Sequence, residues 1–222
     1  MMIVTIDGPS GVGKGTLAHF LVEKLKVNYL NSGSIYRSIA YIADINCVDL
    51  LNTDELISIG DSIIFKTNPE SYDVDIIYND QIINNLIFNE DTAKIASKIS
   101  SNKQLRLSLV SIQRSFAKEP GLVAEGRDMG SVIFPQADIK IFLTANNRTK
   151  AKRRLKQLKE KGINVSLTQL IDELNARDKR DLNRKSSPLI IPDDALVIKT
   201  DNKSINDVQK VAIKYIKSNY KL

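Results

Sequence analysis

The feature that most constrains this sequence is a glycine-rich stretch near its N-terminus, Gly8-Pro9-Ser10-Gly11-Val12-Gly13-Lys14-Gly15-Thr16. A short β-branched run, residues 3–6, precedes the stretch, and an amphipathic helical pattern over residues 17–25 follows it. In this strand–loop–helix context the glycines allow the backbone to approach phosphate oxygens, the helix N-terminus favours negative charge, and Lys14 adds a full positive charge. The stretch therefore predicts a phosphate-binding loop in an α/β fold.

The loop differs from its common form at one position. The lysine is usually followed directly by Ser or Thr, whose hydroxyl holds Mg²⁺. Here Gly15 intervenes, and the hydroxyl of Thr16 comes one residue later. The displaced hydroxyl indicates either a damaged site or a particular subclass, and the loop alone leaves a switch, a motor and a kinase open.

Four further apolar runs have the composition of parallel strands that are covered on both faces. They are residues 27–30, 122–126, 138–145 and 195–200. Helical patterns separate them, one starting at a predicted capping box of Ser166 with Gln169 and one at Ser204. Alternating strands and helices predict a doubly wound parallel sheet, in which ligands bind beyond the carboxyl ends of the strands.

Residues 62–88 break this rhythm with short alternating runs and a turn signal at Asn79-Asp80. The pattern predicts a small antiparallel β insertion. Because no linker, repeat or low-complexity tract interrupts the 222 residues, we expect one domain that carries this insertion.

The composition is typical of a soluble protein in a reducing compartment. Hydrophobic residues make up 42% and charged residues 26%, and no apolar run approaches the roughly 18 residues of a membrane helix. We expect neither a signal peptide nor a membrane anchor, and therefore a cytoplasmic protein. The single cysteine, Cys47, is interpreted as a small apolar residue, and one cysteine with one histidine, His19, argues against a His/Cys metal site.

Arginines follow two of the predicted strands at their carboxyl ends. Arg127 and Asp128 come directly after one strand, and Ser32 and Arg37 come shortly after another. Because the carboxyl ends of parallel strands share one edge of the sheet, both groups are expected near the phosphate-binding loop. The net charge of +6 favours a polyanionic partner, either nucleic acid or a small phosphate compound.

A third basic group lies in an expected helix. Arg177, Asp181 and Arg184 stand at i, i+4 and i+7 and so share one helical face, with Arg180 on the same side. Alone, this pattern is equally typical of a solvated helix with ion pairs four residues apart, and the basic run at 148–161 is interpreted mainly as surface charge. Together with the strand-end arginines, the group predicts convergence on one cleft.

Several arginines without an obvious general base favour phosphoryl transfer to a phosphate over transfer to a hydroxyl. A hydroxyl acceptor commonly uses a carboxylate to take its proton, whereas a phosphate acceptor is already anionic and repels the donor. Two unit charges ~4 Å apart interact by roughly 4 kcal/mol at an effective dielectric of 20. Guanidinium groups relieve that repulsion and grip oxygens in a bidentate fork.

Four segments together resemble the bacterial cytidylate kinases, which are P-loop nucleoside monophosphate kinases. The segments read IDGPSGVGKGT, YLNSGSIYR, VAEGRDMGSVIFPQADIKIFLTA and RDKRDLNRKSSPL, and the resemblance covers about residues 3–216. In such kinases the GKGT form of the loop is common, so Gly15-Thr16 marks a subclass. The resemblance implies one kinase domain, 1–222, with a core at about 1–61, 89–147 and 185–222, a monophosphate-binding insertion at about 62–88 and a helical lid at about 148–184.

The resemblance also implies a role for each site residue. ATP binds the loop from Gly8 to Thr16, and Mg²⁺ arrives with ATP, without a direct protein ligand. Arg37, Arg127 and Arg184 grip the acceptor phosphate; Ser97, Arg106 and Asp128 recognise cytosine; Arg177 and Asp181 hold the sugar; and Ser32 lines the pocket. Lys14, Arg127 and Arg184 are the implied catalytic residues of a direct in-line transfer to CMP or dCMP, giving ADP and CDP or dCDP.

Three positions depart from the family pattern. Asn31 replaces a common Asp, Asp80 replaces a frequent Gly, and Phe88 stands where Arg is expected. The Asn31 departure leaves open whether a carboxylate near the phosphates is missing. The Asp80 and Phe88 departures leave open whether the insertion contributes to acceptor binding.

Two rival functions remain. A kinase for UMP or AMP would share most of the site. A nucleic-acid-binding P-loop protein would use the +6 charge in salt-dependent binding, but the chain has no Trp and only 6% aromatic residues for a stacking platform. We expect ATP and CMP or dCMP as partners, no nucleic acid or membrane, and a monomer.

Overall fold

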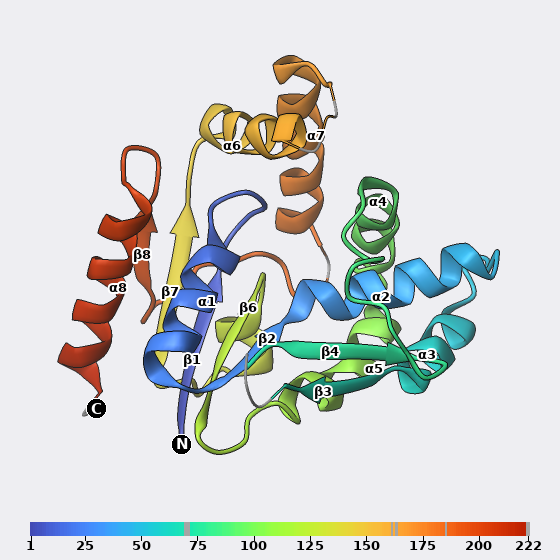
Figure 1. Ribbon diagram of the computed structural model, residues 1–222, viewed down its shortest axis with the longest axis horizontal. Coiled ribbons are helices and arrows are strands. Elements are labelled where there is room, and N and C mark those ends of the chain that lie inside the picture. Colours follow the sequence, from blue (N-terminus) through green and yellow to red (C-terminus); the bar gives the residue numbers. More distant parts are fainter. Residues whose placement is uncertain (69–71, 161, 163, 185, 221–222) are drawn as a thin grey trace.

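The computed structural model describes residues 1–68, 72–160, 162, 164–184 and 186–220, and a five-stranded sheet forms its centre (Figure 1). The strand order is β2-β6-β1-β7-β8, and every neighbouring pair is parallel. The strands are β1 (Met2–Asp7), β2 (Asn28–Asn31), β6 (Gly121–Gly126), β7 (Ile139–Thr144) and β8 (Leu196–Lys199). The predicted doubly wound parallel sheet is therefore confirmed, and its strand ends lie close to the predicted ones.

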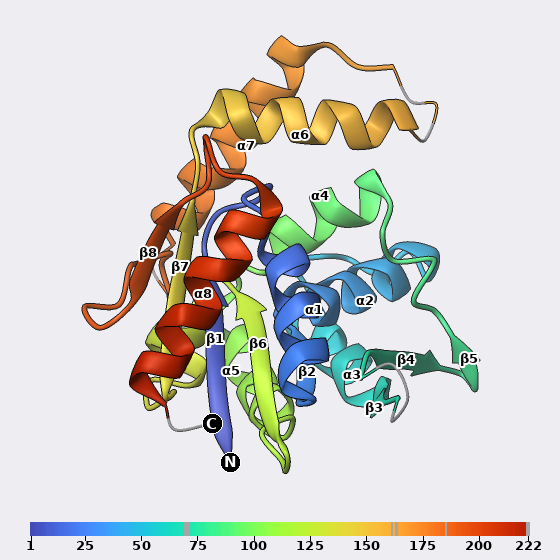
Figure 2. The ribbon, with the colours of Figure 1, turned by 60° about the vertical axis from the view of Figure 1, so that its left-hand side comes forward.

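Helices cover both faces of this sheet (Figures 1 and 2). The helices are α1 (Lys14–Leu25), α2 (Ser32–Ile45), α3 (Thr53–Ser62), α4 (Glu90–Ile99), α5 (Lys103–Arg114), α6 (Asn147–Glu160), α7 (Leu167–Leu182) and α8 (Ile205–Asn219), and a π-helical turn, η1 (Met129–Ile133), follows β6. On β6, Val123 joins the apolar cluster of α1 and α8, whereas Leu122 and Ala124 join the cluster of α2, α3 and α5. Successive hydrophobic residues of one strand are thus buried on opposite faces.

Asparagines start four of the helices. Asn31, Asn52, Asn89 and Asn102 each accept a hydrogen bond from a backbone N–H in the first turn of α2, α3, α4 and α5, respectively. Asn31, which departs from the family pattern, therefore still caps α2 through its side chain, as an Asp at this position could also do.

The predicted antiparallel insertion is present as a three-stranded sheet of order β3-β4-β5. Its strands are β3 (Ile64–Thr67), β4 (Val74–Tyr78) and β5 (Gln81–Ile82). Asn79 and Asp80 have φ angles of 47° and 61°, as a two-residue type I′ hairpin requires. Residues 69–71 of the predicted insertion, 161 and 163 of the predicted lid, and 185 lie outside the described residues.

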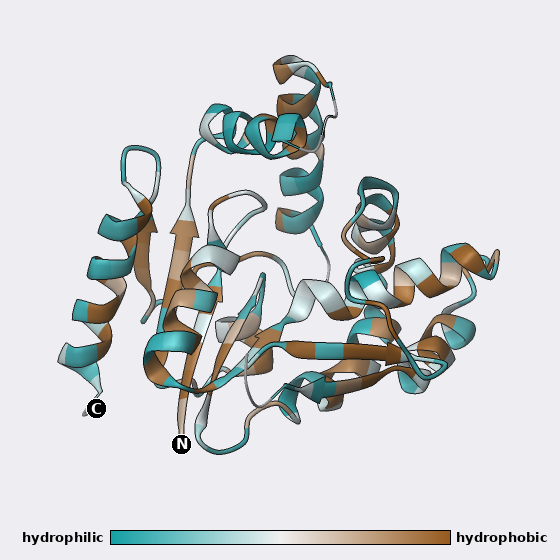
Figure 3. Ribbon diagram, in the orientation of Figure 1, coloured by the Kyte–Doolittle hydropathy of each residue, from teal (hydrophilic) through white to brown (hydrophobic). Residues whose placement is uncertain are grey.

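The region expected as a lid consists of α6 and α7, which lie beyond the carboxyl ends of β1 and β7 (Figures 1 and 2). Ala151, Leu158 and Leu170 form a small apolar cluster between the two helices, separate from the clusters on the sheet. Most other residues of α6 are hydrophilic, as the colouring of the ribbon shows (Figure 3). The pair therefore has its own small core.

Two local predictions for α7 need correction. Ser166 caps the helix by accepting a hydrogen bond from the N–H of Gln169 (3.0 Å), but the Gln169 side chain donates to Glu173, so the reciprocal bond of a capping box is not made. The helix ends at Leu182, so the prediction that Arg184 lies on a helical face is wrong.

Cys47, which the sequence analysis interprets as a small apolar residue, is a free cysteine that lies exposed just after α2. Its backbone has a φ of 54°, which places it in the turn that leaves the helix. None of the helices in the described part of the chain has the length and apolar content needed to cross a bilayer.

Candidate active site

The loop between β1 and α1 runs close to the neighbouring strand β7. A Cβ on Gly8 would lie 2.2 Å from the carbonyl oxygen of Leu143, so only glycine fits at this position. Gly13 has a φ of 97° and takes the left-handed conformation from which the chain turns into α1. The loop therefore ends at a helix N-terminus on the carboxyl side of the sheet, a position that favours an anion.

Lys14 is a buried cation at the start of α1. Its Nζ donates a hydrogen bond to the carbonyl oxygen of Pro9 (2.8 Å). Burial, with repulsion from Arg127, lowers the pKa of Lys14 to about 7, although Glu125 favours the charged form. An anionic ligand beside Nζ would stabilise the protonated amine, so the charge of Lys14 depends on what the loop binds.

Two buried carboxylates stand near the carboxyl ends of β1 and β6. Asp7 accepts hydrogen bonds from two backbone N–H groups of η1 (2.9 and 2.7 Å), and burial raises its pKa to about 6. Oε1 of Glu125 lies 3.3 Å from the place where a Cβ on Gly15 would stand. Glycine at position 15 therefore leaves room for this carboxylate. Because Mg²⁺ prefers oxygen ligands and keeps several waters, Glu125 is suited to hold the water shell of that ion.

A cavity of about 70 Å³, here called the small cavity, lies at the carboxyl end of β6. All nine residues predicted to bind the acceptor line it. They come from α2 (Ser32 and Arg37), α4 (Ser97), α5 (Arg106), the end of β6 (Arg127 and Asp128) and α7 with the residues after it (Arg177, Asp181 and Arg184). The fold thus brings together side chains from five separate segments.

Asp181 is the anion that holds several of these arginines. Its carboxylate accepts hydrogen bonds from Nε of Arg127 (2.8 Å) and from Nη2 of Arg184, and 1% of its side chain is exposed. Burial raises the pKa of Asp181, but attraction to Arg127 and Arg184 outweighs burial and leaves the pKa below its usual value. Burial and repulsion from Arg127 also lower the pKa of Arg177 to about 10. The guanidinium groups therefore repel one another around a shared carboxylate.

A second buried ion pair joins Arg106 to Asp128. Arg106 also donates a hydrogen bond to the carbonyl oxygen of Ser100 (3.1 Å), and its guanidinium lies 5.6 Å from the ring centroid of Tyr36. The hydroxyl of Ser100 accepts a hydrogen bond from Arg184 (3.1 Å). Ser100 therefore connects this pair to the cluster around Asp181.

Unpartnered polar atoms gather at the small cavity. Among the described residues, six buried side-chain nitrogen or oxygen atoms have no hydrogen-bond partner. Four of the six belong to residues of this wall: the hydroxyls of Tyr36 and Ser97, and Nε of Arg106 and of Arg184. Because buried polar groups are normally paired, this concentration indicates a binding site for a polar ligand.

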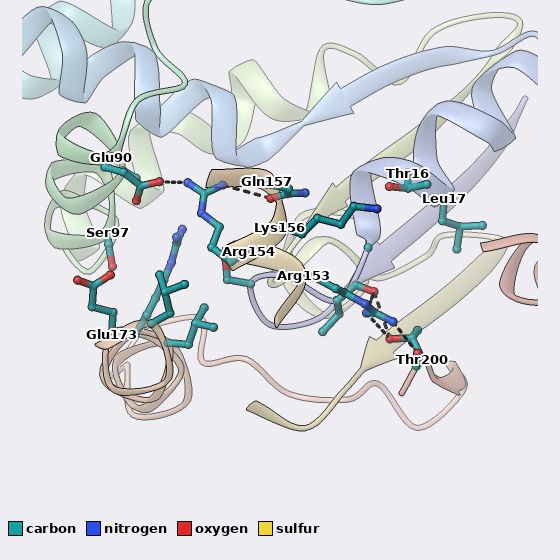
Figure 4. Close-up of a pocket in the computed structure, with 18 of the residues that line it drawn as sticks. Thr16, Leu17, Glu90, Ser97, Arg153, Arg154, Lys156, Gln157, Glu173 and Thr200 are labelled. Carbon is teal, nitrogen blue, oxygen red and sulfur yellow. Dashed lines mark hydrogen bonds and ion pairs between the residues drawn. The ribbon is translucent and has the colours of Figure 1, made fainter. Parts of the chain in front are cut away.

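A larger cavity of about 880 Å³, here called the large cavity, opens between the loop, α6, α7 and the start of α8 (Figure 4). Of the predicted loop residues, Ser10, Gly11, Val12, Gly13 and Thr16 line it, whereas Gly8, Pro9, Lys14 and Gly15 are not among the described residues of its wall. Arg37, Ser97 and Arg177 line both cavities. The two spaces therefore adjoin.

Arg180 does not line the small cavity with the other members of its predicted helical group. It lines the large cavity and is not among the described residues of the small one. Its neighbours Arg177 and Asp181 line the small cavity. Three of the four grouped residues, Arg177, Asp181 and Arg184, therefore line the small cavity, and Arg177 also lines the large cavity with Arg180.

Phe88, the third departure, contacts a residue of both cavities. The ring centroid of Phe88 lies 5.5 Å from the guanidinium of Arg37. Arg37 also donates hydrogen bonds to the carbonyl oxygens of Ile87 (3.1 Å) and Asn89 (3.2 Å). The end of the predicted insertion thus orients Arg37 through an aromatic face and two carbonyls.

Sequence reasoning missed several residues around these cavities. Glu125 carried a usable signal, because a charged residue interrupts an otherwise apolar strand. Ser100 carried none, since its importance depends on partners from other segments. Arg153 and Arg154 were interpreted with their basic run as mainly surface charge, yet both line the large cavity, and Arg154 pairs with Glu90 of α4.

Comparison with known proteins gives consistent similarities over nearly the whole chain. A family model described as cytidylate kinase matches residues 4–218. A cytidylate kinase of Shewanella piezotolerans is 40% identical over 222 residues, covering 99% of this chain and 96% of the relative. Cytidylate kinase 1 of Haemophilus influenzae is 42% identical over 215 residues, covering 97% and 93%. A crystal structure of an uncharacterized protein from Eubacterium ventriosum has a TM-score of 0.54 at 16% identity, covering 98% of each chain, which is a likeness of fold alone.

Proposed function

The chain belongs to the cytidylate kinase family, and we propose that it transfers the γ-phosphate of ATP to CMP or dCMP, giving ADP and CDP or dCDP. One observation carries the assignment of the site. Nine polar residues from five segments surround the small cavity, which adjoins the cavity of the phosphate-binding loop, and unpartnered polar atoms concentrate there.

On the donor side, the triphosphate of ATP binds the loop from Gly8 to Thr16, and the ammonium group of Lys14 contacts the β- and γ-phosphates. The large cavity, about 880 Å³, falls in the usual range for a nucleotide-sized ligand. Mg²⁺ would enter with ATP, held by phosphate oxygens and water, and Glu125 would hold part of that water shell through hydrogen bonds. When bound, the ion neutralises charge on the β- and γ-phosphates.

On the acceptor side, Arg37, Arg127 and Arg184 grip the phosphate of the monophosphate. These guanidinium groups offset the repulsion between two anionic phosphates that must approach within reacting distance. During in-line transfer they also stabilise charge that spreads over the transferring group. Lys14, Arg127 and Arg184 are therefore the proposed catalytic residues.

The Arg106–Asp128 pair suits cytosine. The N4 amino group of cytosine can donate to the Asp128 carboxylate, and O2 and N3 can accept from the Arg106 guanidinium. The unpartnered hydroxyl of Ser97 offers a further hydrogen bond. Uracil presents a carbonyl oxygen at position 4, which the Asp128 carboxylate would repel, so the pair selects for CMP over UMP.

The sugar lies between α2 and α7 in this proposal. Arg177 and Asp181 of α7 hold its hydroxyls, and Ser32 of α2, whose hydroxyl donates to Gln113 (2.7 Å), lines the same pocket. Since Arg177 and Asp181 belong to the lid region, closure of the lid would couple acceptor binding to exclusion of water. Such closure would limit wasteful hydrolysis of ATP.

The acceptor is tested by measuring ADP release in a coupled assay with CMP, dCMP, UMP and AMP. We expect kcat/KM for CMP and dCMP to exceed that for UMP and AMP by about tenfold or more, since one lost hydrogen bond to a charged group costs about 1.5–3 kcal/mol. Comparable turnover of AMP and CMP would contradict the base assignment, and preference for UMP would reverse it.

We also propose that the protein works as a cytoplasmic monomer without nucleic acid as a partner. Light scattering at micromolar concentration tests the monomer, and cell fractionation tests the location. A gel shift at moderate salt tests the rival function, because a nucleic-acid-binding protein with this net charge would bind RNA or DNA strongly and lose the complex as salt rises.

A further inference from the structure

Helix α6 carries two adjacent arginines that are held in different ways. Arg153 donates to the carbonyl oxygen of Thr200 (2.6 Å), to its hydroxyl (3.0 Å) and to the carbonyl oxygen of Val12 (3.4 Å). Among the described residues, Arg154 makes its polar contacts with side chains alone, namely the carboxylate of Glu90 and the amide oxygen of Gln157 (3.3 Å). Arg153 thus fastens α6 to fixed backbone, whereas the partners of Arg154 can be exchanged by side-chain rotation.

The Glu90–Arg154 pair bridges the large cavity between the lid and α4. Both side chains line this cavity and are partly exposed, at 40% and 35%. Figure 4 shows the two groups pointing toward each other from opposite elements, with Gln157 beside them. The pair is thus within reach of a ligand that enters the cavity.

The backbone that carries Glu90 is well fixed. Asn89 caps α4 by accepting a hydrogen bond from the N–H of Thr92 (2.8 Å), and the carbonyl oxygens of Ile87 and Asn89 accept hydrogen bonds from Arg37. The carboxylate therefore projects from a rigid helix start, next to an arginine proposed to grip the acceptor phosphate.

The charge around the pair favours an anion with several negative charges. The described residues of the cavity wall include eight basic and three acidic residues. Burial and repulsion from Arg154 lower the pKa of Arg37 to about 10, so the two guanidinium groups repel each other. A phosphate group offers more negative charge and more acceptor oxygens than one carboxylate.

We propose that Glu90 stands in for a phosphate: its carboxylate holds the lid's Arg154 across the large cavity until phosphate oxygens of the donor nucleotide replace it. The inference rests on the proposed binding of ATP. It makes Glu90 a positioning residue and Arg154 a mobile contact to the donor. It also means that the carboxylate competes with ATP, so removing its charge should strengthen donor binding.

The test compares equilibrium binding of a non-hydrolysable ATP analogue to the full chain and to Glu90→Gln, which removes the charge and keeps the shape. We expect the Kd of Glu90→Gln to fall about two- to fivefold at low salt, the range for a partly exposed ion pair, and the difference to shrink in high salt. Glu55→Gln is the matched control, because Glu55 lies in the first turn of another helix, α3, accepts a hydrogen bond from the side chain of Asn52 and is absent from both described cavity walls. Its Kd should stay within about 1.5-fold of the original.

Two further variants isolate the pair. In an Arg154→Gln background, Glu90→Gln should leave the Kd unchanged, because the competing interaction is already gone. Glu90→Asp, whose shorter side chain holds Arg154 less well, should also lower the Kd, as Glu90→Gln does. An unchanged or raised Kd in Glu90→Gln, an equal drop in Glu55→Gln, or an undiminished drop without Arg154 would each overturn the proposal.

A structural role for Glu90 would give a different pattern. If Glu90 only stabilised the fold, Glu90→Gln would have a lower melting temperature and a higher KM for CMP. If Glu90 competes with ATP for Arg154, the variant should instead have a changed affinity for the donor and an unaltered KM for CMP. Phosphorylation of another monophosphate in place of CMP would contradict the proposed acceptor and leave this test intact, since the test measures donor binding alone.

Discussion

Replacing Asp181 by asparagine tests whether one carboxylate holds the arginines of the site together. The substitution preserves shape, removes the charge, and leaves the guanidinium groups of Arg127 and Arg184 facing each other without their shared partner. The Asp181 side chain is 1% exposed, so solvent cannot compensate. Removing one partner of a buried ion pair costs about 3–5 kcal/mol. For a chain of this size each kcal/mol lowers the melting temperature by about 2–4 °C, so we expect a drop of about 6–20 °C.

The assay is thermal unfolding of Asp181→Asn at neutral pH, without and with inorganic phosphate. Phosphate should raise the melting temperature of the variant more than that of the original, because the anion replaces the lost charge. The pKa of Asp181 lies below its ordinary value of 3.8, so its contribution is present above that pH and disappears as the pH falls through the lowered pKa. The difference between the two proteins should therefore vanish in strong acid.

A matched surface change defines the baseline for this measurement. Asp194 pairs with Lys140, and 64% of the Asp194 side chain is exposed, so Asp194→Asn should cost less than about 1 kcal/mol. If Asp181→Asn lost no more stability than Asp194→Asn, or if phosphate stabilised both proteins equally, repulsion among the arginines would not be what Asp181 opposes.

Three further predictions address the loop and the base. Since the pKa of Lys14 is lowered to about 7, binding of an ATP analogue at pH 8 should take up close to one proton, which calorimetry in buffers of different ionisation enthalpy measures. The Kd of the analogue should also rise as the pH increases above 7. Lys14→Met should abolish both effects. Asp128→Asn should lower the ratio of kcat/KM for CMP over UMP by about 10- to 100-fold in competition assays, because an amide can donate to the carbonyl of uracil. Gly8→Ala should lower the melting temperature and the affinity for the ATP analogue, since its Cβ would lie 2.2 Å from the carbonyl oxygen of Leu143; unchanged unfolding would contradict the steric argument.

The signals that predicted the fold are local. The strand β1 ends where an apolar run meets Asp7 and Gly8, and β6 ends at Gly126, so both boundaries are visible in the sequence. The hairpin at Asn79-Asp80 was predictable because both residue types tolerate a positive φ. Where a local pattern determines the backbone, a single sequence is sufficient.

The site was predictable in part, through the rule that parallel strands end at one edge. From the sequence alone, that rule predicts that Arg127 and Asp128 lie near Ser32 and Arg37, and all four residues line the small cavity. It could not place Arg106, a buried residue of an amphipathic helix, because nothing in the helical pattern distinguishes a buried arginine from a solvated one. For that residue the expectation came from family resemblance alone.

The remaining contacts depend on how distant segments pack. Arg184 lies just beyond the end of α7 and donates a hydrogen bond to the hydroxyl of Ser100, the residue that follows α4. Glu90 and Arg154 belong to different helices, α4 and α6, and form an ion pair at the large cavity. Side-chain pairs between such segments follow from tertiary structure, and no spacing rule within one helix or strand predicts them.

The carboxylates Asp181 and Glu90 each hold an arginine that the two proposals assign to phosphate groups, Arg184 and Arg154 respectively. Binding then exchanges one anionic partner for another, so the Coulomb gain for each arginine is smaller than that of an unpaired cation. The larger gain must come from polar atoms that begin without a partner, among them the hydroxyls of Ser97 and Tyr36. A free phosphate can replace a carboxylate but cannot reach all of these atoms, whereas a nucleotide of the right shape can. Selectivity for a nucleotide over a simple anion follows from this difference.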